Sequence, residues 1–239
     1  NYKILRMRIA LFGYGKMGQM IEQIALNRGH EIVAKIDEHT QNIDFSSMDV
    51  AIDFSMPEAA FSNITKCLEN NVPIISGTTG WLDKYQDAVT LCKSKNGAFI
   101  YASNFSLGVN IFFELNNYLA KMMQNLPEYK VTLEEIHHTQ KLDAPSGTAI
   151  TLAEGVISNS EYTQWKLDDD SNNSLPITSK RIGKTPGTHT VNYNNVVDSI
   201  EIKHIAHNRE GFALGAVTAA EWIIGKAGIF SMRDVLNLG

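Results

Sequence analysis

A glycine-rich loop between a short apolar strand and a helix restricts the fold of this chain more than any other feature. The loop Gly13-Tyr14-Gly15-Lys16-Met17-Gly18 follows an apolar strand at 8–12, and apolar residues then recur at helical spacing as far as Gly29. A second strand, 32–36, stops at Asp37, which lies 19 residues after Gly18. Glycines at this spacing let a pyrophosphate approach the start of a helix, and an acid at this distance can bind ribose hydroxyls. The pattern predicts a dinucleotide site formed by Gly13, Tyr14, Gly15, Lys16, Met17, Gly18 and Asp37.

The same alternation of strands and helices continues to residue 102. Further strands are expected at 49–54, 72–76 and 98–101, and helices are expected from Pro57 and through Ala88 and Leu91. This order predicts an α/β fold with a Rossmann-like, doubly wound parallel sheet and right-handed crossovers.

The pattern changes after Asn104, which predicts a second domain. We expect a helix over 108–123, a strand over 130–136, a helix from 147 to about 157, and strands over 189–195 and 198–206 joined near Asn194-Asn195. Residues 158–180 are polar and rich in Asn, Asp and Ser, so they are predicted to be a mobile loop. A helical pattern returns over 212–225. The expected organisation is a dinucleotide-binding domain at 1–105 and an α+β domain with a mixed sheet, for substrate binding and oligomerisation, at 106–212.

Composition narrows the function. The 239 residues carry a formal net charge of −5, which argues against a nucleic-acid partner. No apolar run approaches the roughly 18 residues needed to span a bilayer, and the N-terminus lacks a signal-peptide core. Cys67 and Cys92 fall in expected helices and are predicted to be buried thiols. We therefore expect a cytoplasmic protein with no membrane partner, in which residues 1–6 are an extension before Met7.

Residues 135–149 combine groups that donate protons with a helix start that can bind an anion. Ser146 is a favourable helix N-cap, and Pro145 stiffens the approach to it. The first-turn N–H groups of Gly147 and Thr148 can then hold a carboxylate or phosphate. His137, His138 and Lys141 precede this helix and supply protons and positive charge.

This segment, His-His-x-x-Lys-x-Asp-Ala-Pro-Ser-Gly-Thr-Ala, resembles the signature of the dihydrodipicolinate reductase family of lysine biosynthesis. The resemblance extends from the glycine loop to the closing residues 230–236. It implies that NAD(P)H delivers hydride to a hydroxylated, unsaturated cyclic dicarboxylate, that water is lost, and that (S)-tetrahydrodipicolinate forms. By this resemblance His137 is the proton donor, Lys141 is a second donor or charge stabiliser, and His138, Gly147 and Thr148 hold substrate carboxylates.

The resemblance also assigns further parts of the chain. Two strand-end loops resemble the family's nicotinamide contacts: Gly77, Thr78 and Thr79 in one, and Ala102, Ser103, Asn104 and Phe105 in the other. Residues 213–239 are implied to fold back onto the first domain. Family members are usually homotetramers joined through the sheet of the second domain, so a homotetramer is expected here. No metal is expected.

The cofactor preference follows from the residues after the second strand. Asp37 and Glu38 favour NADH, because the 2′-phosphate of NADPH prefers a cation, and relatives that use NADPH often have an arginine here. Lys16 and Lys35 are nearby cations that can still support phosphate binding. We expect NADH to be preferred and NADPH to be tolerated.

Several positions remain open. Thr139 and Gln140 are neutral where the family often has a basic residue, which is expected to lower substrate affinity modestly. Arg181-x-Gly183-x-x-x-Gly187-x-His189, Lys203-His204 and Arg209 also resemble the family, and they would add positive charge around a dianionic substrate. Taken singly, Arg181 and Arg209 are more often surface salt-bridge partners, and His204 is equally compatible with a half-buried strand residue. Two alternatives to the reductase are another two-domain dehydrogenase acting on an amino-acid-like substrate and a nucleotide-binding redox sensor without catalysis.

Overall fold

The computed structural model describes residues 6–238, and the chain divides into two compact units. One unit combines Asn1–Leu107 with Glu210–Gly239, and the other is Gly108–Arg209. Residues 1–5 of the expected N-terminal extension lie outside the described residues. The helices of the described part include none that is both long and apolar enough to cross a membrane.

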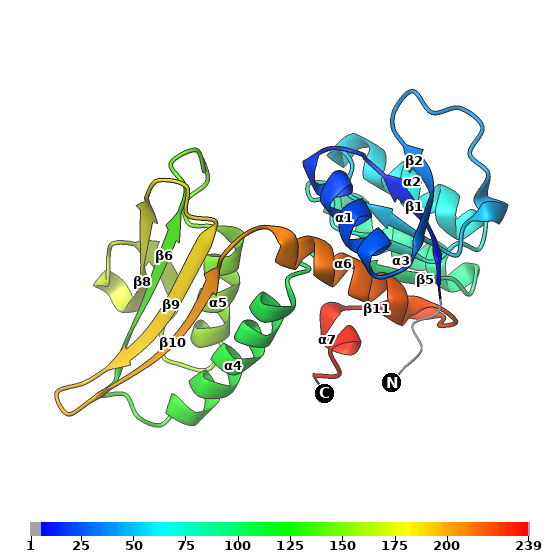
Figure 1. The fold of residues 1–239 in the computed structure, drawn as a ribbon. Helices are drawn as coiled ribbons and strands as arrows, with labels where there is room; N and C mark the ends of the chain where they lie inside the picture. Colours follow the sequence, from blue (N-terminus) through cyan, green and yellow to red (C-terminus); the bar gives the residue numbers. More distant parts are fainter. Residues whose placement is uncertain (1–5, 239) are drawn as a thin grey trace. The chain divides into compact units, whose positions relative to one another are not determined.

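The first unit is built on a six-stranded parallel sheet (Figure 1). Its strand order is β11-β5-β4-β3-β1-β2, and each adjacent pair is parallel. The strands are β1 (Arg8–Phe12), β2 (Glu31–Ile36), β3 (Val50–Asp53), β4 (Ile74–Ser76), β5 (Ala98–Tyr101) and β11 (Gly228–Phe230). This sheet confirms the predicted Rossmann-like fold. The sequence patterns had not indicated β11, which is only three residues long.

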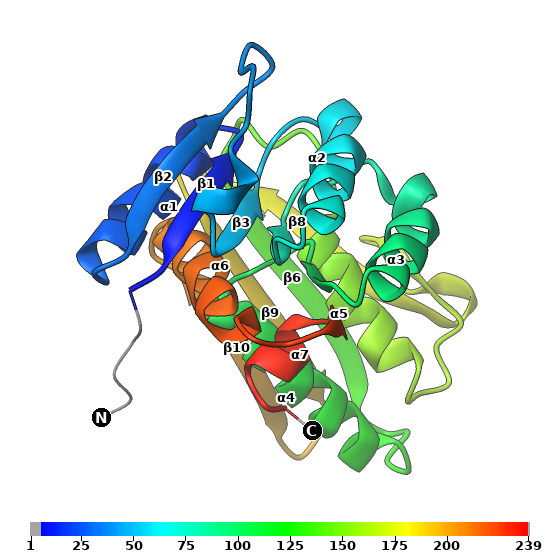
Figure 2. The same cartoon turned by 90° about the vertical axis from the view of Figure 1, so that its right-hand side faces the viewer.

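Successive strand residues point to opposite faces of the sheet, and in these strands the residues on both faces are apolar. Helices therefore cover both faces. Ile9 and Leu11 of β1 face one core, together with α1 (Lys16–Asn27), α6 (Glu210–Ile223) and α7 (Met232–Val235). Ala10 and Phe12 face the other core, together with α2 (Pro57–Glu69) and α3 (Tyr85–Ser94), which lie beside each other in Figure 2. Cys67 and Cys92 are free, buried thiols of α2 and α3, as predicted.

The second unit is a mixed five-stranded sheet with two helices on one face (Figures 1 and 2). The strand order is β10-β9-β6-β8-β7, in which β6 pairs antiparallel to β9 and parallel to β8. The elements are α4 (Leu107–Met123), β6 (Lys130–His137), α5 (Gly147–Ile157), β7 (Gln164–Leu167), β8 (Ser174–Arg181), β9 (Gly187–Asn194) and β10 (Ser199–Ala206). Leu133, Leu152 and Val191 are among the side chains that join sheet and helices in one core.

The prediction of a mobile loop over residues 158–180 was wrong. Two strands, β7 and β8, occupy about half of this range. The inward residues of β8, Leu175 and Ile177, are fully buried, but Pro176 separates them and Ser174 and Thr178 flank them, so no long apolar run results. The Asn- and Asp-rich stretch is the turn between these strands, where Asp168, Asn172 and Asn173 have positive φ. Loop-forming residues therefore mark the connection and not the whole segment.

Candidate active site

The glycine loop leaves open space at the beginning of α1. A Cβ at Gly13, where φ is +86°, would lie 2.3 Å from the Phe54 carbonyl oxygen, and a Cβ at Gly18 would lie 2.5 Å from that of Gly13. A Cβ at Gly15 would instead have no atom of the described chain within 4 Å. Gly13 and Gly18 are thus required by the packing of the protein itself. The missing side chain at Gly15 keeps a space clear beside the helix N-terminus, where a pyrophosphate binds in this fold.

A pocket of about 770 Å³ adjoins this loop and is lined by Gly13, Asp37, Glu38 and Lys66 among other residues. Asp37 Oδ1 accepts hydrogen bonds from the Thr40 hydroxyl at 2.8 Å and from the His39 N–H at 3.0 Å. These bonds lower the pKa of Asp37, so its carboxylate is charged at neutral pH. A fixed carboxylate at the end of β2 is suited to accepting hydrogen bonds from ribose hydroxyls.

Lys35 is the nearest cation on β2, and it is already paired. Its Nζ lies 2.7 Å from a Glu22 carboxylate oxygen and donates to the Tyr14 hydroxyl at 3.0 Å. The ammonium also lies 4.3 Å from the centre of the Tyr14 ring, and the Tyr14 hydroxyl bonds to Glu22. The positive charge of Lys35 is therefore already neutralised by the Glu22 carboxylate. Lys16, the first residue of α1, is exposed.

The buried Asp53, which the sequence patterns did not single out, connects the loop that follows β3 with the loop that follows β4. Asp53, at the end of β3, accepts hydrogen bonds from Ser55 Oγ and Asn63 Nδ2 through Oδ1, at 2.6 and 3.0 Å. Its Oδ2 accepts from Ser76 Oγ at 2.8 Å and from Thr78 Oγ1 at 2.7 Å. Burial raises the pKa of Asp53, and these four bonds oppose that effect. The signal in the sequence was an acid at the end of an apolar strand, and its register partner in the structure is Ser76 of β4.

The two predicted nicotinamide loops follow β4 and β5, which are neighbours in the sheet. A Cβ at Gly77 would lie 2.3 Å from the Phe54 ring, and the Thr78 carbonyl accepts a 2.8 Å bond from the Trp81 indole. In the second loop Asn104 Oδ1 accepts from the Ser106 N–H at 2.8 Å, and the buried Phe105 ring lies 5.8 Å from that of Phe54. The fold brings both loops and the glycine loop to the carboxyl edge of one sheet, where ligands bind in doubly wound folds.

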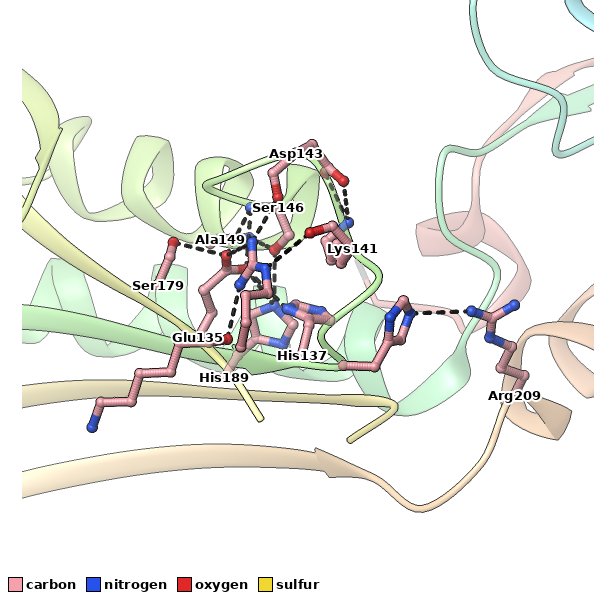
Figure 3. A network of polar contacts seen from close by, with 12 residues as sticks. Glu135, His137, Lys141, Asp143, Ser146, Ala149, Ser179, His189 and Arg209 are labelled. Carbon is pink, nitrogen blue, oxygen red and sulfur yellow. Dashed lines mark hydrogen bonds and ion pairs between the residues drawn. The ribbon is translucent and has the colours of Figure 1, made fainter. Parts of the chain in front are cut away.

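The predicted acid–base groups lie in the second unit around Glu135, which is fully buried (Figure 3). Its carboxylate accepts hydrogen bonds from the Ser146 N–H at 3.1 Å, from Ser179 Oγ at 2.8 Å and from Arg181 Nη2 at 3.2 Å. Burial by itself would raise the pKa of Glu135, but the contacts of the His137 and His189 rings and the hydrogen bonds from Ser146 and Ser179 outweigh it and hold the pKa far below its usual range. Glu135 is therefore a carboxylate at neutral pH.

Two histidine rings lie against this carboxylate. His137 Nδ1 is 3.3 Å and His189 Nε2 is 3.7 Å from Glu135 Oε2. The two rings meet edge to face with centroids 5.0 Å apart, because Glu135 and His189 are register partners on β6 and β9 and His137 is two residues along the same face. Burial lowers the pKa of His189, which favours the neutral form of this ring.

Arg181 fastens the connection between β6 and α5. Besides Glu135, it donates to the Asp143 carbonyl at 2.6 Å and to the Lys141 carbonyl at 3.3 Å. Ligand atoms of Glu135, His137 and His189 lie within 4.8 Å of one another, a spacing that a metal ion can bridge. The Arg181 guanidinium already supplies positive charge to this carboxylate.

Lys141 and His138, both in this connection, each have a partner. Lys141 Nζ donates to both carboxylate oxygens of Asp143, at 2.7 and 2.8 Å. His138 Nε2 lies 3.4 Å from Arg209 Nη2, so these two basic groups are adjacent. His204 is half-buried on β10 against Gly108 and the Phe112 ring, and burial lowers its pKa. Lys203 is exposed.

The start of α5 has the expected cap. Ser146 Oγ accepts from the Ala149 N–H at 3.2 Å, and its carbonyl accepts from the Ile150 N–H. Gly147 and Thr148 form the first turn, and a Cβ at Gly147 would have no atom of the described chain within 4 Å. A substrate carboxylate can therefore approach this helix N-terminus without displacing a side chain at residue 147.

A dinucleotide-type sheet in one unit and an acid–base network in the other define a class, the nicotinamide-dependent oxidoreductases with a separate substrate unit. Residues 7–105 match the family described as "Dihydrodipicolinate reductase, N-terminus", and residues 108–236 match "Dihydrodipicolinate reductase, C-terminus". The chain belongs to the dihydrodipicolinate reductase family. Its activity is that of an NAD(P)H-dependent oxidoreductase of the diaminopimelate route to lysine.

Individual relatives agree with this assignment over nearly the full length. The chain is 58% identical to the 4-hydroxy-tetrahydrodipicolinate reductase of Christiangramia forsetii, covering 97% of this chain and 98% of that one. It is 35% identical to the enzyme of the same name from Thermosipho africanus, with the same coverage. The solved structure of a dipicolinate-bound dihydrodipicolinate reductase from Paenisporosarcina sp. TG-14 has the same fold, with a TM-score of 0.80 at 23% identity over 96% of this chain and 99% of that one. These findings confirm the family and the fold class indicated by the sequence.

Proposed function

We propose that this chain reduces (2S,4S)-4-hydroxy-2,3,4,5-tetrahydrodipicolinate to (S)-2,3,4,5-tetrahydrodipicolinate with loss of water. The name shared by relatives that are 58% and 35% identical over nearly the whole chain supports this substrate, and so does the dipicolinate bound to the structural relative. The observation that carries the proposal is the buried Glu135–His137 pair beside the Ser146-capped start of α5. It combines a proton donor and an anion-binding helix terminus in one unit.

The nicotinamide cofactor supplies the hydride, and the residues of the second unit bind the dicarboxylate and supply the proton. His137 donates a proton as negative charge develops on the reduced ring, because imidazole exchanges protons readily near neutral pH. Lys141 stabilises that charge or acts as a second donor, for which its ammonium must turn from Asp143 towards the substrate. His138 and the first-turn N–H groups of Gly147 and Thr148 hold the carboxylates.

The cofactor is held by the first unit, and NADH is the preferred form. Gly13 to Gly18 receive the pyrophosphate at the start of α1, and Asp37 accepts hydrogen bonds from the adenosine ribose. A 2′-phosphate at this position would lie near Asp37 and Glu38, while the charge of Lys35 is balanced by Glu22. NADPH therefore binds more weakly but is not excluded. Residues 77–79 and 102–105 contact the nicotinamide end.

The test is oxidation of NADH and of NADPH, followed by absorbance, with substrate generated in situ from pyruvate and aspartate semialdehyde by the preceding synthase. Rapid oxidation that depends on the synthase is expected, with higher kcat/KM for NADH. Comparable values for the two cofactors, or an advantage for NADPH, would overturn the cofactor preference alone.

Absence of turnover, with NADH binding measured separately, would overturn the substrate assignment. It would favour a dehydrogenase acting on an amino-acid-like substrate or a nucleotide-binding sensor. The homotetramer expected from the family is tested by light scattering after size-exclusion chromatography.

A further inference from the structure

Glu135 lies at the point of β6 where the buried side chains change from apolar to ionisable. On the inward face of this strand Val131 and Leu133 are buried in the apolar core, and the next two inward residues are Glu135 and His137. A buried carboxylate is costly unless hydrogen bonds and opposite charge compensate for its desolvation. Glu135 has both forms of compensation, which indicates a specific task for this side chain.

The two carboxylate oxygens of Glu135 have different partners. Oε1 is bound by Ser179 Oγ at 2.8 Å and Arg181 Nη2 at 3.2 Å, both from β8. Oε2 faces the rings, 3.3 Å from His137 Nδ1 and 3.7 Å from His189 Nε2. The Ser146 N–H lies 3.1 Å from each oxygen. One oxygen thus fixes the orientation of the carboxylate, and the other is presented to the rings.

This arrangement determines which ring nitrogen of His137 faces outward. With Nδ1 directed at Glu135, Nε2 lies towards Gly187, where an added Cβ would be only 3.1 Å away. A side chain at position 187 would therefore crowd Nε2, and glycine leaves that space free. A carboxylate behind the opposite nitrogen favours the protonated ring with its Nε2–H available for donation, as in other histidine–carboxylate pairs.

The charge of Glu135 also offsets nearby cations. The titratable groups around His137 are Glu135 on its own strand, His189 on β9, Arg181 on β8, and Lys141, Asp143 and His138 in the following connection. Two of these, Arg181 and Lys141, are cations, and they disfavour a proton on His137. Asp143 pairs with Lys141 and Glu135 pairs with Arg181, so a charged His137 depends on the single carboxylate in contact with its ring.

We propose that Glu135 is the positioning residue of this active site, which acts on the reaction by orienting His137 and stabilising its protonated ring. This rests on the role proposed above for His137. Glu135 does not contact the substrate; it acts through the imidazole that does.

The experiment compares Glu135→Gln with Glu134→Gln. Glutamine retains the shape of Glu135 and removes its charge. Glu134 is the preceding residue of β6 and pairs with Lys180 at 2.5 Å, with its side chain 37% exposed, so Glu134→Gln removes the same charge from the same strand without touching the histidines. For Glu135→Gln we expect kcat to fall about 10- to 100-fold, which is the usual loss when a residue that orients a directly acting side chain is removed. KM and the NADH dissociation constant should change less than about threefold. The basic limb of the kcat–pH profile, where the proton donor loses its proton, is expected to move to lower pH. Glu134→Gln should match wild type.

A double-mutant cycle separates positioning from a general loss of structure. If Glu135 acts through His137, then Glu135→Gln combined with His137→Gln should be no slower than His137→Gln alone. Ser179→Ala, which removes the 2.8 Å bond to Oε1 and keeps the charge, is a milder second variant for the case that Glu135→Gln unfolds. It should lower kcat severalfold and show the same non-additivity.

The outcomes distinguish this inference from the proposed function. Loss of turnover in His137→Gln with normal kcat and pH profile in Glu135→Gln overturns the positioning role alone. Additive losses in the double variant do the same, because they place Glu135 in an independent role. Normal turnover in His137→Gln overturns both the proton-donor assignment and the inference built on it.

Discussion

Replacing Gly15 by alanine should leave the fold intact and weaken NADH binding by about 10- to 100-fold, or roughly 1.4–2.7 kcal/mol. The backbone of Gly15 has φ −78° and ψ −160°, which alanine also adopts, and a Cβ there would have no described atom within 4 Å. Alanine is a poorer N-cap than glycine by about 0.5–1 kcal/mol, and it recovers about 0.4–1 kcal/mol by restricting the unfolded chain. The two effects nearly cancel, so the melting temperature should change by no more than a few degrees, by the usual ~2–4 °C per kcal/mol.

Gly13→Ala is the matched control within the same loop. Its φ of +86° costs a non-glycine residue about 1–3 kcal/mol, and the 2.3 Å approach to the Phe54 carbonyl adds a similar amount. The sum is about 2–6 kcal/mol, which corresponds to a melting temperature lowered by roughly 5–20 °C.

Thermal melting and fluorescence titration with NADH measure the two effects separately. Gly15→Ala should melt like wild type and bind NADH weakly, while Gly13→Ala should melt early. If Gly15→Ala bound NADH as tightly as wild type, the space beside Gly15 would not be the pyrophosphate site. If Gly13→Ala were as stable as wild type, our account of loop packing would be refuted.

Three further predictions concern the donors, the cofactor and pH. His137→Gln and Lys141→Ala should each lower kcat by about two to four decades with an unchanged melting temperature, and near-normal turnover in both would refute their roles. Glu22→Gln should release Lys35 and raise the NADPH-to-NADH ratio of kcat/KM about two- to fivefold; an unchanged ratio would show that the pairing with Lys35 does not set the preference. The pKa of Glu135 is held below its ordinary value near 4.5, so its carboxylate stabilises the fold above that pH and this stability is lost as pH falls below it. Chemical denaturation of wild type should therefore show a steeper loss of stability below about pH 4.5 than Glu135→Gln does, and parallel curves would contradict this.

The parts of the fold that could be predicted are those that local hydrophobic periodicity indicates and those that begin at a residue with a strong preference for a helix start. The β1–loop–α1 segment, Pro57 at the start of α2 and Ser146 at the start of α5 each have a local physical cause. β8 escaped prediction because Leu175 and Ile177 are isolated apolar residues whose burial depends on pairing with β6, more than 40 residues earlier.

The candidate site divides in the same way. The sequence identified His137, Lys141 and Ser146 by their chemistry and spacing. It did not indicate the tasks of Asp53 and Glu135, because the partners of these carboxylates come from other strands. Nor did it indicate that Lys35 pairs with Glu22, or that Arg181 is directed at backbone carbonyls, since such pairings depend on strand register and side-chain direction.

The discontinuous first unit has a consequence for the order in which the chain folds during synthesis. Its α6, which buries Ala213, Ala216 and Val217, and its edge strand β11 both belong to the last 30 residues. A Cβ at Gly215 would lie 1.7 Å from the Phe105 carbonyl, so α6 packs directly on the strand-end loop that follows β5. Until α6 has left the ribosome, Ile9 and Leu11 lack this cover, whereas the second unit is a single continuous stretch of sequence. Domains made in one stretch fold as units during translation. The second unit of this chain can therefore complete its core first, and the cofactor-binding unit, although most of it is made earlier, completes its core last.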